Sequence, residues 1–201
     1  MPITGKHIRE ITATDVLELV LNQTREDAFL EFKEVLFRAD YTPEKLDQAK
    51  DDFARDVVAF ANAQGGHIVV GIKENEGHAS ELKPMDQHNA ARLAAIARDT
   101  AIQRVRPNAY MEVNELPTDA ERGQWVVVAF IPESGNKPHM WAFGGRMDFV
   151  IRDNDRKRPM SYDEIKEMFI KGPQEQWAAR ILSELESLRS VVEDLSANLE
   201  K

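Results

Sequence analysis

The sequence predicts a single α/β (α+β) domain, built around a mixed sheet, with a C-terminal helix of the coiled-coil type. Two observations lead to this fold class. Amphipathic helices alternate with short apolar strands along most of the chain, and the last part changes to a heptad pattern. The 201 residues are enough for one sizeable core and an appendage. We expect an N-terminal helical extension at 1–24, the domain at 25–171 and the coiled-coil helix at 172–201.

The first elements are indicated by capping residues and by the spacing of apolar side chains. A short helix opens near residue 14, and residues 30–37 are typical of a strand. Because strand side chains alternate, Glu31 and Lys33 are expected to share one face of that strand. Thr42 is a typical N-cap residue, and Pro43 after it suits the first position of a long helix. This helix carries one apolar stripe at spacings of three and four residues, formed by Leu46, Ala49, Phe53, Val57 and Phe60.

The second half of the domain alternates between strands and a helix. Gly65-Gly66 ends the long helix, since glycine accepts the positive φ of a C-cap. After it we expect a buried strand at 67–72, a loop at 75–84, a helix at 86–104, strands at 109–116 and 124–131, and a hairpin of 141–143 with 147–151 around two glycines.

The C-terminal part is predicted to be helical. Ser161 and Glu164 form a capping box that opens a helix to Ile170, and Gly172-Pro173 interrupts it. A second helix follows, with apolar residues at alternating steps of four and three: Ile181, Leu185, Leu188, Val192, Leu195 and Leu199. This heptad pattern favours self-association, most simply a homodimer through residues 174–199. The alternative is that the stripe packs back on its own domain.

Composition narrows the class of protein. The net charge of −9 argues against a protein that coats nucleic acid without specificity, so any nucleic-acid contact must be a local patch. The absence of Cys excludes disulfides, zinc–thiolate sites and cysteine nucleophiles. No apolar run approaches the ~18 residues of a membrane span, and the N-terminus lacks a signal-peptide core. We therefore expect a cytoplasmic protein with no membrane partner.

Three carboxylates form the candidate site. Glu26 and Glu31 flank the entry to the first strand, and Glu74 ends the strand that follows the Gly-Gly turn. If the segments lie side by side, these carboxylates converge on one spot, as in sites for Mg²⁺ or Mn²⁺ that serve phosphate chemistry. The alternative is three ordinary surface carboxylates, one of them paired with Lys33.

The chain resembles the Schlafen/AlbA-type domain family, whose members are described as DNA-binding or as divergent ATP-binding modules. The likeness covers residues 25–171, is specific at its first two motifs and is loose after residue 80. The matching motifs are Glu26 with Glu31-Phe32-Lys33, then Ala59-Phe60-Ala61-Asn62, Gly65-Gly66, Val70-Gly71-Ile72, Ile131-Pro132-Glu133-Ser134 and Ile151-Arg152.

The resemblance implies an activity. In the RNA-cleaving members two Glu and one Asp form a metal-dependent active site, and these positions correspond to Glu26, Glu31 and Glu74, with Glu in place of Asp. These three would hold Mg²⁺ or Mn²⁺, and Lys33 would meet the phosphate. The leading hypothesis is therefore a nucleic-acid-binding protein acting as a metal-dependent endoribonuclease on structured RNA, with RNA preferred over DNA.

Two alternatives remain open. One is a non-catalytic DNA-binding or regulatory module, in which the carboxylates only organise the fold. The other is a nucleotide-binding domain, in which Gly65-Gly66 would cradle phosphates. Phosphate loops usually lead from a strand into a helix, whereas this pair leads from a helix into a strand, so ATP is not expected as a cofactor.

The basic residues are concentrated after the predicted hairpin. Arg152 and the run Arg156-Lys157-Arg158 form the densest basic segment, with Arg146 as a weaker companion. This cluster is the candidate phosphate-contacting surface for nucleic acid. The alternative is a solvated turn that Asp153 and Asp155 partly neutralise.

Overall fold

The computed structural model of the chain describes residues 3, 5–170 and 189. The chain divides into two compact units, residues 1–134 with 139–160 and residues 135–138 with 161–201, and each is described by itself. The predicted mixed α+β architecture is confirmed. The heptad segment at 174–199 lies outside the described residues apart from residue 189, so the coiled coil and the dimer stay predictions.

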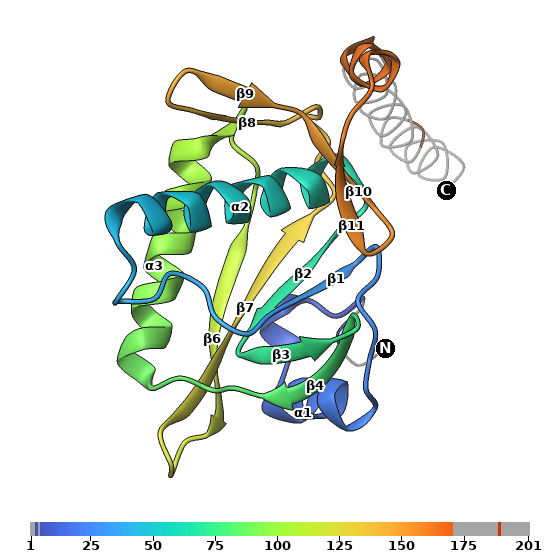
Figure 1. Cartoon of the computed structure of the whole chain (residues 1–201). Helices are drawn as coiled ribbons and strands as arrows, with labels where there is room; N and C mark the ends of the chain where they lie inside the picture. The colour runs from blue at the N-terminus through green and yellow to red at the C-terminus, as the bar shows by residue number, and fades with distance from the viewer. Residues whose placement is uncertain (1–2, 4, 171–188, 190–201) are drawn as a thin grey trace, which may run out of the picture. The chain divides into compact units, whose positions relative to one another are not determined.

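A four-stranded mixed sheet forms the centre of the first unit (Figure 1). Its order is β1-β2-β7-β6, comprising β1 (Leu30–Lys33), β2 (Gly65–Val70), β7 (Gln124–Pro132) and β6 (Glu112–Asp119). β1 runs parallel to β2, while β2 with β7 and β7 with β6 are antiparallel. The parallel pair needs a long crossover between its strands, which the long helix supplies.

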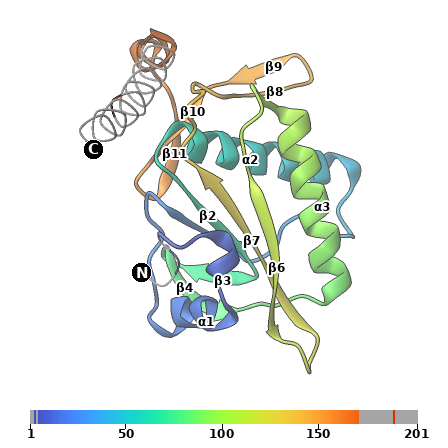
Figure 2. The ribbon, with the colours of Figure 1, turned by 180° about the vertical axis from the view of Figure 1, so that it is seen from behind.

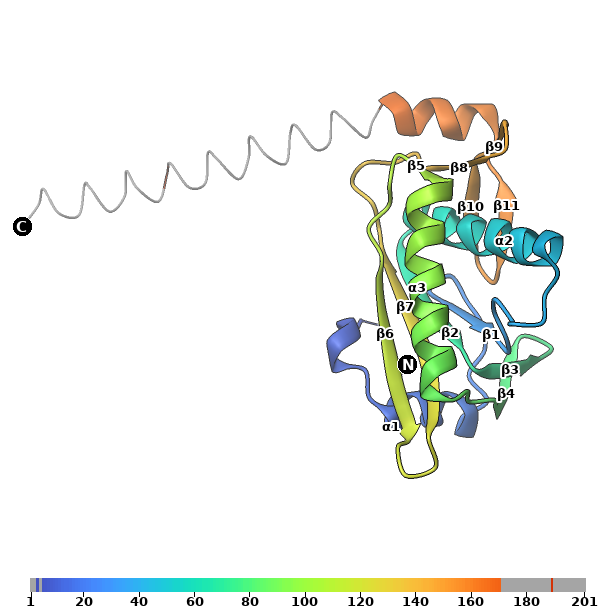
Figure 3. The same ribbon diagram turned by 90° about the vertical axis from the view of Figure 1, so that its left-hand side faces the viewer.

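Helices cover both faces of this sheet. α2 (Pro43–Asn62) and α3 (Gln87–Arg104) lie on one face, whereas α1 (Ala13–Leu21) and the short helix Ile8–Glu10 lie on the other (Figures 2 and 3). The strands alternate accordingly. Ile68 and Val70 pack into the core with α2 and α3, and Val69 between them packs into the core beside α1.

Two predicted elements differ in the structure, one in type and one in length. The predicted loop at 75–84 is largely the hairpin β3 (Ile72–Asn75) and β4 (His78–Leu82). Its turn residues Glu76 and Gly77 both have positive φ, the geometry that joins tightly paired strands. The predicted strand at 30–37 stops at Lys33, where its pairing with β2 ends, and Phe37 further on has a φ of 53° that no strand adopts.

The last part of the first unit consists of hairpins. β5 (Val105–Arg106), β8 (Met140–Phe143) and β9 (Arg146–Asp148) form a small sheet, which confirms the hairpin around the two glycines. The predicted strand at 147–151 is in fact two strands. Residues from 150 onward pair in a separate hairpin, β10 (Val150–Asp153) with β11 (Arg156–Pro159).

The helix starts follow the predicted capping chemistry. The Thr42 side chain accepts a hydrogen bond from the backbone N–H of Lys45, and Pro43 follows it. In the second unit residues 162–170 are helical, and Ser161 and Glu164 exchange both bonds of a capping box. Among the described residues, no helix combines the length and the hydropathy that crossing a bilayer requires.

Candidate carboxylate and basic site

β1 directs Glu31 and Lys33 toward the helix face of the sheet. Its alternate residues Leu30 and Phe32 pack into the opposite core, beside α1. Since neighbouring side chains on a strand point to opposite faces, Glu31 and Lys33 must lie under α2. The predicted shared face is therefore confirmed.

Arg152 encloses Glu31. Its Nη1 donates to Glu31 Oε2 at 2.5 Å, and its other nitrogens donate to the carbonyl oxygens of Asp27, Leu30 and Asn154. The Arg152 side chain is only 2% exposed, and its guanidinium stacks over the Phe60 ring. Arg152 thus fixes β1 against β10 and does not present its charge to solvent.

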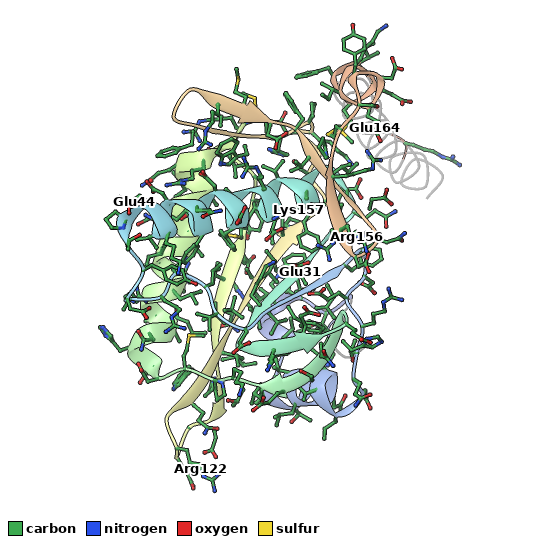
Figure 4. The ribbon with its side chains drawn as sticks, in the orientation of Figure 1. Glu31, Glu44, Arg122, Arg156, Lys157 and Glu164 are labelled. Carbon is green, nitrogen blue, oxygen red and sulfur yellow. The ribbon has the colours of Figure 1, made fainter. Side chains whose placement is uncertain are left out.

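Asp56 on α2, which the sequence analysis missed, continues this network. Its carboxylate receives Lys157 Nζ at 2.6 Å and lies 3.5 Å from Lys33 Nζ, and Lys33 also pairs with Glu31. We name the alternating series Arg152–Glu31–Lys33–Asp56–Lys157 the charge chain. Figure 4 labels Glu31 on β1 and Lys157 on the β10–β11 hairpin.

The buried carboxylates of the charge chain determine the protonation state of Lys33. The Asp56 side chain is 2% exposed. Burial by itself would lower the pKa of Lys33, but Asp56 and Glu31 outweigh it and raise that pKa above its usual value. Lys33 therefore stays charged. The signal that could have identified Asp56 is its position beside Val57 in the apolar part of α2, where an aspartate is found only when paired.

The turn of the β3–β4 hairpin brings Glu74 next to Glu26. The backbone N–H of Glu26 donates to the Gly77 carbonyl at 2.7 Å, and the Gly77 N–H donates to Glu74 Oε2 at 2.6 Å. Glu26 Oε1 accepts from the Phe32 N–H at 2.7 Å. Glu26, Glu31 and Glu74 therefore belong to one neighbourhood.

The crowding of these carboxylates shifts the pKa of Glu26. Burial and the negative charge of Glu31 raise the pKa of Glu26 to about 7, with a smaller contribution from Glu74. The Phe32 N–H and the charge of Lys33 oppose the increase. Like charges held together out of water disfavour the ionised form, so Glu26 titrates near neutral pH.

The fit of these residues to a divalent cation is incomplete. Among the residues that the structure describes, no three Asp, Glu or His side chains are arranged to hold one metal ion. Glu31 is already neutralised by Lys33 and Arg152. As the chain is arranged, the three carboxylates are neighbours but do not form one ligand set.

Exposed arginines gather at the β10–β11 turn. Arg156 is 87% exposed, and its carboxylate neighbour Asp155 lies 3.8 Å away. Arg25, which the sequence analysis missed, is also exposed and donates to Asp155 at 3.2 Å, and Arg158 pairs with Asp153 at 3.0 Å. We call Arg25, Arg156 and Arg158 the hairpin arginines.

Arg146 belongs to a different cluster. It pairs with Asp51 of α2 at 3.2 Å and lies over the Trp141 ring. Asp51 also receives the Trp141 Nε1–H at 3.1 Å and the buried guanidinium of Arg104. The structure therefore separates Arg146 from the hairpin arginines, while leaving its side chain 68% exposed.

Gly65 and Gly66 serve close packing. A Cβ on Gly65 would lie 2.5 Å from the backbone nitrogen of Glu133, and a Cβ on Gly66 would lie 2.5 Å from the Phe60 ring and 2.6 Å from the Phe29 carbonyl oxygen. Only glycine fits against these atoms. Protein atoms thus fill the space beside both α-carbons.

Comparison with known proteins places most of the chain in one family. The family model described as Schlafen, AlbA_2 matches residues 26–161, more than half of the chain. Comparison with curated proteins gives no match.

Solved structures show more distant likeness. The DIP2311 protein of Corynebacterium diphtheriae is 19% identical with a TM-score of 0.47, and the match covers 79% of this chain but only 28% of that protein. The N-terminal domain of a putative ATP-dependent DNA helicase RecG-related protein from Nitrosomonas europaea is 21% identical with a TM-score of 0.44. The match covers 76% of this chain and 96% of that domain.

Proposed function

Because the chain belongs to the Schlafen, AlbA_2 family, we propose that it binds nucleic acid, RNA in preference to DNA, through the hairpin arginines. The observation that carries this proposal is the exposure of Arg156, at 87%, in an otherwise acidic protein with a net charge of −9. Since affinity for nucleic acid comes largely from phosphate neutralisation, a local cluster of exposed arginines is the surface that can provide it.

The other basic residues have different roles in this proposal. Arg152 and Lys157 are held by Glu31 and Asp56, so they position the hairpin and do not contact phosphate themselves. Arg146 is a peripheral contact, since it is exposed but shares its charge with Asp51. Sequence alone could not make this distinction, because all of these residues are basic and close in the chain.

A pair of charge reversals tests the interface. Arg156→Glu is compared with Arg122→Glu, because Arg122 is also exposed, at 79%, and also has an aspartate neighbour, at 3.5 Å. Figure 4 shows Arg122 at the β6–β7 turn, away from Arg156. Binding to transfer RNA and to single- and double-stranded DNA is measured by fluorescence anisotropy across a salt series.

We expect Arg156→Glu to weaken binding about tenfold and to reduce the salt slope by about 1, and Arg122→Glu to behave like the parent. Equal affinities of the two variants would exclude the hairpin arginines as the interface. Tighter binding of DNA than of transfer RNA would instead support the DNA-binding alternative.

A second candidate function is a metal-dependent endoribonuclease at Glu26, Glu31 and Glu74, with Lys33 beside them and Mg²⁺ or Mn²⁺ as the cofactor. The observation that favours it is that the β3–β4 turn holds Glu74 next to Glu26, close to Glu31, where burial and the neighbouring carboxylates raise the pKa of Glu26 to about 7. Electrostatic crowding of this kind concentrates at functional sites. A divalent cation would relieve it, although the present arrangement provides an incomplete ligand set.

Glu26→Gln is the variant that tests this candidate, because Glu31 also stabilises the fold. Transfer RNA is incubated with the parent and the variant in manganese, magnesium or EDTA, with Glu34→Gln as the control. Metal-dependent cleavage that only Glu26→Gln removes would support the endoribonuclease. Retention of RNA without cleavage would leave a non-catalytic binding module.

We also propose that the chain forms a homodimer through residues 174–199, on the strength of the heptad pattern alone. Light scattering of the full chain and of a truncation after residue 171 tests this. A dimer that becomes a monomer on truncation supports the proposal, and an unchanged oligomer rejects it.

A further inference from the structure

A pocket of about 440 Å³ lies in the first unit, between the segment that follows β1 and the start of α3. Its apolar lining includes Leu36, Met85 and Leu93, which pack against the core cluster under α2 and α3. This volume lies within the range of sites that bind small molecules, and such sites combine an apolar lining with a few polar groups. None of the lining residues belongs to the charge chain or to the hairpin arginines.

Arg92 is the cation of this pocket that lacks a carboxylate partner. The other two lining cations are neutralised, since Arg38 donates twice to Asp40, each at 2.9 Å, and Lys83 pairs with Glu81 at 2.6 Å. Arg92 donates to the Phe37 carbonyl oxygen at 2.6 Å, and within the described part of the chain no carboxylate lies at ion-pair distance from it. Its positive charge is therefore available to a ligand.

Protein contacts fix the segment that carries the lining residues Leu36 and Arg38. Phe37 has a φ of 53°, a conformation that is strained for a non-glycine residue and persists only where packing enforces it. Its ring is fully buried and meets the Phe53 ring edge-on at 5.6 Å. The Arg92 bond to the Phe37 carbonyl then joins α3 to this segment. A preformed pocket loses little affinity to ordering when it binds.

We propose that this pocket binds a small organic monoanion with an apolar body, the anionic group on Arg92 and the body on Leu36, Met85 and Leu93. A guanidinium prefers carboxylate-like groups, with which it makes charge-assisted hydrogen bonds. Because Arg38 and Lys83 are paired with Asp40 and Glu81, Arg92 offers one positive charge to a ligand, and the lining carboxylate Glu34 disfavours a second negative charge. The pocket therefore selects a single negative charge over a phosphate dianion or polyphosphate.

Calorimetry with the full chain and three matched probes tests the ligand class. The probes are 2-naphthoate, neutral 2-naphthalenemethanol and the 2-naphthyl phosphate dianion, which share one apolar body. We expect naphthoate to bind at least about tenfold more tightly than the alcohol, because the alcohol cannot use the charge of Arg92. The phosphate should also bind more weakly than naphthoate, because Glu34 repels its second negative charge and the other lining cations, Arg38 and Lys83, are already paired.

Arg92→Gln and Arg98→Gln form a matched pair of variants. Arg98 lies on the same helix and also donates to a backbone carbonyl, that of Val113 at 2.8 Å, but it is not part of this pocket. Arg92→Gln should lose about tenfold in affinity for naphthoate and leave the alcohol unchanged, whereas Arg98→Gln should bind like the parent.

A third variant locates the site if Arg92→Gln proves unstable. Val35 lines the pocket and is 43% exposed, so Val35→Trp can fill the pocket without removing an ion pair. It should abolish binding of both naphthoate and the alcohol. The proposal is overturned if no probe binds the parent, if the alcohol matches naphthoate, if the phosphate binds more tightly than naphthoate, or if Val35→Trp binds normally.

Discussion

The guanidinium of Arg152 on β10 binds the carboxylate of Glu31 on β1 at 2.5 Å, across 121 positions of sequence. Both side chains are nearly enclosed, and Lys33, Asp56 and Lys157 extend the alternation of charge toward the surface. Two residues predicted to act separately, one on a metal and one on phosphate, are thus joined in a single structural contact. This contact anchors the hairpin that presents Arg156.

Replacing Glu31 should destabilise the fold. Glu31→Gln leaves the buried guanidinium of Arg152 without a counter-charge, and an uncompensated buried charge costs about 3 kcal/mol. Urea denaturation measures the loss. The control is Asp40→Asn, which removes the exposed pair with Arg38 and should change the free energy of unfolding far less. Similar losses in both variants would show that the Arg152–Glu31 contact is not a stabilising one.

Glu26 should make stability depend on pH. Its pKa is about 7 in the folded protein against a usual value of 4.5, so between these values the folded state holds a proton that the unfolded state releases. The free energy of unfolding therefore falls as the pH rises through this window. Glu26→Gln removes the effect, so the variant should gain stability relative to the parent near pH 8 and show no such gain near pH 4. A difference that stays constant across this range would contradict the assignment.

Asn62 should be essential for stability. Its side-chain amide donates to the carbonyl oxygens of His139 and Val150 at 2.8 and 2.9 Å, and its oxygen accepts from the His139 N–H at 2.7 Å. Asn62→Ala removes these three buried hydrogen bonds, at a cost of about 3 kcal/mol. The exposed neighbour Gln64→Ala should change the free energy of unfolding by less than about 0.5 kcal/mol. Equal effects in urea denaturation would refute this role.

Gly66 should not tolerate a side chain. Gly66→Ala places a Cβ 2.6 Å from the Phe29 carbonyl oxygen, and the resulting overpacking should cost about 2–3 kcal/mol. The comparison is Gly123→Ala, where φ is +65° and no atom lies within 4 Å, so only backbone strain of about 1 kcal/mol is expected. Thermal unfolding of both variants separates the effect of crowding from that of backbone strain. A smaller loss of stability for Gly66→Ala than for Gly123→Ala would contradict the prediction.

The elements with strong local signals were predictable. α2 begins at its Thr42-Pro43 cap and follows its apolar stripe, and β7 follows its apolar run, because capping and periodicity are properties of neighbouring residues. The β3–β4 hairpin was missed because its strands are short and mostly exposed, so their pattern differs little from that of a loop.

The candidate site was only partly predictable. The sequence indicated Glu26, Glu31 and Glu74 as members, but their partners come from distant segments. Asp56 enters from α2, where its apolar surroundings indicate that it has a partner but do not identify that partner. Arg25 reaches the β10–β11 turn and has no comparable local signal. The burial of Arg152 could not be predicted either, because the local sequence around an arginine on a strand does not show whether a carboxylate or water contacts it.

The sequence by itself determined the helices, most of the sheet strands, the family likeness and the face shared by Glu31 and Lys33, since these follow from interactions among residues close in the chain. The tertiary structure alone decided which charges are neutralised and which remain exposed. Arg152 and Lys157 are held by carboxylates, whereas Arg156 extends into solvent and Arg92 lines a pocket without a counter-charge. The physical reason is that burial and charge pairing depend on segments far apart in sequence, and these quantities set both the pKa of Glu26 and the availability of each cation.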